Sequence, residues 1–105
     1  MEYSRNKKGF TMVDHITFDL VLPTLSLIAQ AVFLRVYRQT VGWKRKSDRI
    51  SLSQFRATIG CKHNRQVIRG IRELEERELI HVRRRGTIVN EYSIVWDTVL
   101  SFYDE

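Results

Sequence analysis

Residues 51–76, "SLSQFRATIGCKHNRQVIRGIRELEE", carry two amphipathic helix patterns in immediate succession. In the first pattern, Ser51 and Gln54 have the spacing of a capping box, and Gly60 marks the end. The second begins near Asn64 and places three apolar residues on one face: Val67, Ile71 and Leu74. Two such helices joined by a tight, glycine-containing turn are typical of a helix-turn-helix.

The flanking segments extend this motif to a complete fold. Residues 79–83 and 91–95 are rich in β-forming residues and predict a hairpin whose loop contains Gly86 and Asn90. Upstream, residues 26–40 predict a helix that Gly42 ends, and a short strand is expected at 49–51. We therefore predict an α+β fold, a winged helix-turn-helix of three to four helices with a C-terminal β-hairpin wing.

The remaining segments set the expected boundaries. Residues 10–13 suggest an extended piece, Asp14 an N-cap, and Pro23 the end of a short helix. The 26–40 helix should be buried on most faces, because its apolar residues are Leu27, Ile28, Ala31, Val32, Leu34 and Val36. Asp97 could cap one more helix. The expected division is a flexible basic arm (1–9), a winged-helix domain (10–96) and a C-terminal helix or start of a linker (97–105).

Composition narrows the class of partner. Eighteen Lys and Arg against twelve Asp and Glu give a net charge of +6, which favours nucleic acid or a membrane surface. No apolar run approaches the roughly 18 residues of a membrane span, so no membrane association is expected. Cys61 is the single cysteine and excludes an internal disulfide. The expected location is a reducing cytoplasm.

The charge order in the second helix is opposite to the one that the helix dipole favours. Basic residues (Lys62, Arg65, Arg69) lie near its beginning and acidic residues (Glu75, Glu76, Glu78) near its end. Phosphates at the N-terminus would remove this conflict. The acidic half would then pair Arg69 with Glu73 and Arg72 with Glu76. The alternative is an ordinary surface helix held by such pairs, but residues 43–72 contain nine basic side chains and one acid.

Base and phosphate contacts can be assigned to residue types. The expected base-reading residues are Asn64, Arg65, Gln66 and Arg69, since Arg suits guanine and Asn or Gln suits adenine. Gln66 could instead cap its own helix, and Ile68 could meet a thymine methyl group or simply be exposed. The expected backbone and wing contacts are Ser53, Gln54, Lys62, His63, Arg72, Arg83, Arg84, Arg85, Thr87, Lys44 and Lys46. For the wing and for residues 44–46, a solvated basic surface is the alternative.

Catalysis has little support in the sequence. His15, His63 and His81 are scattered and lack metal-ligand spacing, and no glycine-rich phosphate loop occurs. We therefore expect no enzyme activity, no metal and no cofactor. Cys61 is expected to pack rather than react. Trp43 and Trp96 are expected in the core or against the hairpin.

Three stretches resemble the N-terminal domain of phage replication initiators of the lambda O-protein type. They are "FT" at 10–11, "YRQTVGWKRKSDRISLSQ" at 37–54 and "RELEERELI" at 72–80, and the resemblance covers residues 9–95. It implies a winged helix that binds repeated double-stranded DNA sites at a replication origin. It also implies that a separate C-terminal region would engage the helicase or its loader, and that the protein acts in the cytoplasm of a bacterial host. The turn "IGCKHNRQ" (59–66) is one residue longer than usual, with His63 at a common serine position, which leaves the base-contact register open by one residue.

Two other functions fit the same fold. A transcriptional regulator of the winged-helix type would differ only in where its sites lie. A protein-interaction winged helix would use the apolar tail at 99–103, including Val99 and Phe102. A homodimer through the N-terminal helix or the C-terminal segment is also left open.

Overall fold

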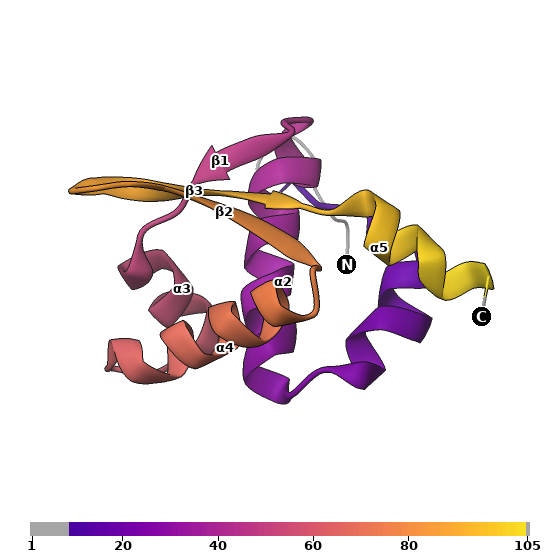
Figure 1. Cartoon of the computed structure of the whole chain (residues 1–105), viewed down its shortest axis with the longest axis horizontal. Coiled ribbons are helices and arrows are strands. Elements are labelled where there is room, and N and C mark those ends of the chain that lie inside the picture. Colours follow the sequence, from indigo (N-terminus) through magenta and orange to yellow (C-terminus); the bar gives the residue numbers. More distant parts are fainter. Residues whose placement is uncertain (1–8, 105) are drawn as a thin grey trace.

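The computed structural model describes residues 9–104, so the predicted arm lies outside the described residues apart from Gly9. The elements are η1 (Ile16–Val21, π-helical), η2 (Leu22–Thr24, 3-10), α2 (Leu27–Thr40), η3 (Val41–Trp43, 3-10), β1 (Ser47–Arg49), α3 (Leu52–Ile59), α4 (Asn64–Glu76), β2 (Ile80–Arg85), β3 (Ile88–Ile94), α5 (Trp96–Ser101) and η4 (Phe102–Asp104, 3-10). Figure 1 shows α2 in the centre of the molecule and α3 and α4 on one side of the sheet. The tip of the β2–β3 hairpin projects away from α2. This order confirms the α+β, winged helix-turn-helix prediction.

The three strands form one antiparallel sheet in the order β1–β3–β2. Tyr92 of the central strand β3 lies opposite Asp48 of β1 and Val82 of β2. The predicted strand at 49–51 was placed too late, because β1 ends at Arg49. Ile50 is then buried in the core and Ser51 caps α3.

The hairpin is longer than predicted. Its strands continue to Arg85 and from Ile88, so only Gly86 and Thr87 form the turn. Gly86 has φ +65°, a left-handed conformation that glycine adopts without strain. The prediction that Asn90 lies in the loop was wrong, since Asn90 belongs to β3 and its carbonyl accepts a hydrogen bond from Ile50 N.

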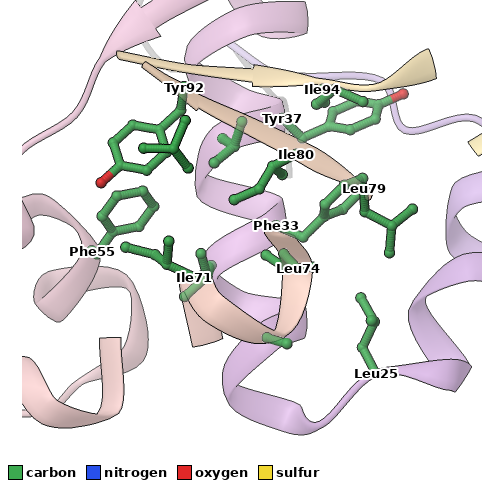
Figure 2. Packing of buried hydrophobic residues seen from close by; sticks show 14 of the residues in the cluster. Leu25, Phe33, Tyr37, Phe55, Ile71, Leu74, Leu79, Ile80, Tyr92 and Ile94 are labelled. Atoms are coloured by element: carbon green, nitrogen blue, oxygen red, sulfur yellow. The ribbon is translucent and has the colours of Figure 1, made fainter. Parts of the chain in front are cut away.

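The core joins the helix-turn-helix to the base of the wing. Phe55 of α3 meets Tyr92 of β3 edge-on, with ring centroids 5.1 Å apart and planes at 77° (Figure 2). Ile71 and Leu74 of α4 are buried in the same cluster, together with Phe33 of α2. Such aromatic pairs contribute about 1 kcal/mol beyond the area they bury.

The α2 helix is less completely buried than its sequence suggests. Leu27 is 81% exposed and Leu34 is also exposed. Leu27 is the first residue of α2, at the end of this helix farthest from the sheet (Figure 1). The buried stripe consists of Ala29, Val32, Phe33, Val36, Tyr37, Gln39 and Thr40.

The helix-turn-helix forms as predicted. Gln54 N donates to Ser51 Oγ (3.2 Å) and Ser51 N donates to Gln54 Oε1 (2.9 Å), which completes the capping box. Gly60 ends α3 with φ +79°. α4 crosses α2 at Gly70, where an added Cβ would lie 2.9 Å from Val32 Cγ2. The glycine therefore permits the close approach of the two helices.

Asp14 caps the N-terminal helical segment, as expected. His15 directly precedes η1, but it is Asp14 Oδ2 that accepts a hydrogen bond from Thr17 N at 2.8 Å. The Tyr37 hydroxyl donates to Asp14 Oδ1 at 2.5 Å. Burial opposes ionisation of Asp14, yet these hydrogen bonds lower its pKa, while burial and the Asp14 contact raise the pKa of Tyr37 to about 12.

Residues 10–13, predicted as an extended piece, belong to no helix or strand. Two other expectations at the chain ends need correction. Pro23 does not end the helical segment, because it is the second residue of η2, in the first turn, where the backbone N–H that proline lacks has no partner within the helix. Asp97 lies inside the first turn of α5, whose N-cap is Val95 without a side-chain hydrogen bond.

Candidate nucleic-acid interface

α4 separates its buried and exposed residues as its sequence predicts. Val67, Gly70, Ile71 and Leu74 are buried. The opposite face consists of Arg65, Gln66, Ile68, Arg69 and Arg72, all exposed, and Asn64, which is half-buried. Ile68 is 43% exposed, so a methyl-sized apolar contact is available among the charged side chains. This face can donate hydrogen bonds from several guanidinium and amide groups at once.

The first turn of α4 carries basic charge and no acid. His63 occupies the N-cap position, but its imidazole makes no cap hydrogen bond. Lys62 and His63 are both exposed. Cys61 packs against the core, as expected, and its thiol donates to the His63 carbonyl at 3.4 Å.

Asn64 is held by a residue to which the sequence analysis gave no role. Arg56 of α3 donates from Nη1 to Asn64 Oδ1, and both side chains are half-buried. Arg56 was counted only in the basic total of residues 43–72. Arg56 lies five residues after the α3 N-cap Ser51 and eight before Asn64, and this spacing gave no local signal, because the contact depends on how α3 and α4 cross.

The acidic half of α4 is used differently from the prediction. Glu73 accepts hydrogen bonds from Ser26 N (3.0 Å) and Ser26 Oγ (2.7 Å), so it binds the beginning of α2 instead of Arg69. Within residues 9–104, no salt bridge joins Arg72 to Glu76. Burial opposes ionisation of Glu73, but the Ser26 hydrogen bonds lower its pKa. Arg69 and Arg72 thus keep their guanidinium groups clear of the expected partners.

Glu75 connects α4 to the wing. Its two carboxylate oxygens accept from Arg84 Nη1 and Nη2 at 2.9 and 2.8 Å, a bidentate pair. This hydrogen bonding lowers the pKa of Glu75 and raises that of Arg84. The pair lies in a groove of about 280 Å³ between α4 and the hairpin, which Ile68, Arg72 and Tyr92 also line.

The wing arginines, predicted as one group, point in different directions. Arg83, Arg84, Arg85 and Thr87 are all exposed, and the strand register shifts between Arg83 and Arg85. Arg84 turns to Glu75, whereas Arg83 lies 3.9 Å from Glu91 and lines a hollow of about 420 Å³ with Lys46 and Ser93. Arg85 makes no salt bridge with any residue from 9 to 104.

The structure does not bring residues 44–46 to α4. Figure 1 shows the segment between α2 and β1 on the opposite side of the sheet from α3 and α4. Lys44 and Lys46 are exposed there, and Arg45 pairs with Asp48 at 3.2 Å. By contrast, the beginning of α4 and the tip of the wing lie on the same side of the molecule (Figure 1).

Ser53 and Gln54 lie at the first turn of α3 and are exposed. Gln54 Oε1 is occupied by the capping box, which leaves its amide N–H groups as donors. Ser53 Oγ lies 2.9 Å from Ser51 Oγ, so the two hydroxyls share a hydrogen bond.

Three expectations about apolar side chains are corrected. Trp43 is 61% exposed, not in the core, because it lies in η3 beyond the end of α2. Trp96 is also partly exposed and packs edge-on against Tyr37, with ring centroids 5.8 Å apart. Val99 is fully buried and Phe102 is half-buried, so Val99 offers no surface to a partner.

Neither a metal cluster nor a membrane span is found in residues 9–104. These residues contain no group of three or more His, Cys, Asp or Glu side chains able to hold a metal ion. No helix in that range is long and apolar enough to cross a bilayer.

Comparison with known proteins gives a match to one family model. No curated protein and no solved structure matches the chain significantly. Residues 4–96 match the family described as bacteriophage replication protein O, which confirms the resemblance seen in the sequence. Since the match extends over the helix-turn-helix, the sheet and the beginning of α5, the chain belongs to the bacteriophage replication protein O family, whose members serve phage DNA replication.

Proposed function

We propose that this chain binds double-stranded DNA sequence-specifically at repeated sites of a replication origin, as the N-terminal module of a phage or mobile-element initiator. The observation that carries the proposal is the outward face of α4. Arg65, Gln66 and Arg69 are exposed, while the acids nearest to them, Glu73 and Glu75, are engaged elsewhere. A helix of this kind fits the major groove and can donate to base edges.

The proposed division of roles follows the geometry. Arg65, Gln66, Arg69 and Asn64 read bases, and Lys62, His63, Arg72, Ser53 and Gln54 bind nearby phosphates. Arg85 and Thr87 at the wing tip contact the backbone or a narrow minor groove on the same side of the protein. Arg84 holds the wing to α4 through Glu75, and Arg83, Lys44 and Lys46 contribute mainly long-range attraction.

The test begins with selection from random duplex DNA, followed by titration of the selected site and a scrambled one at two salt concentrations. Neutralisation of about 5 to 8 phosphates predicts a slope of log K against log salt near −5 to −7. A discrete motif with the scrambled site at least about a hundredfold weaker supports the proposal. Iterated copies of that motif at an origin favour replication, and copies at promoters favour transcriptional control.

Matched variants separate reading from attraction. Arg65→Ala or Arg69→Ala should weaken specific binding by about 1 to 3 kcal/mol and relax one base position. Lys44→Ala, with the same loss of charge but on the other side of the sheet, should weaken every sequence slightly and equally. Equal effects of the two kinds of variant, or equal binding to selected and scrambled DNA, would contradict the proposal.

A further inference from the structure

Arg56 and Asn64 connect the two helices of the helix-turn-helix through side chains. Arg56 Nη1 donates to Asn64 Oδ1 across the turn. A second arginine, Arg35 of α2, makes a comparable contact with α3 by donating to Thr58 Oγ1 at 2.6 Å, but it does not reach α4. Arg56 is therefore the arginine that can act on the beginning of α4.

The chemistry of the guanidinium group fixes the orientation of the Asn64 amide. Arginine has only donors, so the group that faces it must be the carboxamide oxygen. The NH₂ group of Asn64 then points away from Arg56, and no residue from 9 to 104 accepts a hydrogen bond from it. Asn64, at the first position of α4, therefore turns its oxygen toward Arg56 and its NH₂ donors away from it.

We infer that Arg56 is a positioning residue that turns Asn64 into a donor-only reader, which selects guanine or thymine in the major groove instead of adenine. This inference rests on the proposed function. Asparagine recognises adenine by accepting from N6 and donating to N7, which needs both ends of the amide. Guanine offers two acceptors, N7 and O6, and thymine offers O4. Adenine also offers N7, but its neighbouring N6 amino group needs an acceptor, as does the amino group of cytosine, so a donor-only amide loses the second hydrogen bond to adenine.

The experiment is selection from random duplex DNA with the whole chain and four variants. For the wild type, one position should prefer guanine or thymine, and Asn64→Ala should abolish that preference. Arg56→Met frees the amide oxygen and should raise the relative affinity for adenine at that position by about fivefold or more. Arg56→Lys keeps a donor and should keep the original preference. Arg35→Met is the matched control, which removes an inter-helix arginine without changing base preference.

A further variant guards against loss of folding. Asn64→Asp retains the partner of Arg56 and replaces the NH₂ donors with a second acceptor, so it should fold and lose the guanine or thymine preference. Thermal melting of each variant checks folding separately.

Two kinds of failure are distinguishable. A selected motif in which Asn64→Ala alters no position, or in which Arg56→Met leaves the preference unchanged, overturns the inference and makes the contact purely structural. The same holds if the wild type prefers adenine at the Asn64 position. Absence of any motif, for the wild type and all variants, overturns the proposed function and the inference with it.

Discussion

Gly70→Ala tests whether the contact between α4 and α2 is as tight as the structure shows. In an unobstructed helix, alanine would raise the free energy of unfolding by about 1 kcal/mol relative to glycine. At Gly70, the new Cβ would lie 2.9 Å from Val32 Cγ2, 3.0 Å from Ile28 Cγ2 and 3.4 Å from the Ile28 carbonyl oxygen. Ordinary contacts are near 3.5–4.0 Å, so side chains or helices must move by about 0.5 Å.

The size of the effect follows from these opposing contributions. Overpacking of a close-packed core costs about 1 to 3 kcal/mol, which exceeds the helix-propensity gain over most of that range. We expect Gly70→Ala to lower the free energy of unfolding by about 1 kcal/mol, within a range of about 0 to 2 kcal/mol. Urea unfolding followed by fluorescence of Trp43 and Trp96 measures this change, and the slope with urea should stay constant.

A double-mutant cycle identifies the cause. Val32→Ala alone removes buried volume, but in the Gly70→Ala background it also relieves the clash, so its cost should fall by about 0.5 kcal/mol or more. If Gly70→Ala raises stability by about 1 kcal/mol and shows no coupling to Val32, the close approach of α2 and α4 is refuted.

Three further predictions concern carboxylates and the turn after α4. Glu73→Ala should lower the free energy of unfolding by about 1 kcal/mol, because it removes both hydrogen bonds to Ser26 at the beginning of α2. Glu76 is exposed, so the control variant Glu76→Ala should change the free energy of unfolding little. Urea unfolding of the two variants measures the difference. The Glu75–Arg84 pair, whose hydrogen bonding lowers the pKa of Glu75, should contribute stability above the ordinary carboxyl pKa and lose it as the pH falls through the lower folded value. Thermal melts from pH 7 to 3 measure the stability that the protein loses on acidification, and this loss should be about 0.2 to 1 kcal/mol smaller in Glu75→Gln than in the wild type. The same loss in both proteins would speak against a stabilising Glu75–Arg84 pair. Glu78 has φ +58°, so Glu78→Gly should raise stability by about 1 kcal/mol in urea unfolding, and a decrease would show that its side chain matters more than its backbone strain.

The helix-turn-helix could be predicted almost residue by residue because its signals are local. The capping box of Ser51 and Gln54, the left-handed end at Gly60 and the spacing of Val67, Ile71 and Leu74 each depend on residues within a few positions of one another. Strand ends could not be predicted as well. Asn90 favours turns in isolation, but pairing of its carbonyl with Ile50 keeps it in β3, and that partner lies forty positions away.

The exposed face of the candidate site could be predicted from the sequence, but the partners of its charged side chains could not. The charge spacing along α4 suggested an ion pair between Arg69 and Glu73. Glu73 instead accepts a hydrogen bond from Ser26, which is 47 positions away in sequence. Arg83 and Arg84 are neighbours in β2 and therefore point to opposite faces of the sheet, where their partners are Glu91 and Glu75. Ion-pair partners depend on which helices cross, and sequence spacing within one helix contains no information on that crossing.

The alternation of buried and exposed positions along α4 has a consequence for how this protein can change. Val67, Gly70 and Leu74 are buried against the core, while the side chains at positions 65, 66 and 69 are exposed. Substitutions at the second set leave packing untouched, so they should be nearly neutral for folding. The surface that α4 presents can thus diversify rapidly between related replicons, or be exchanged in the laboratory, on an unchanged scaffold.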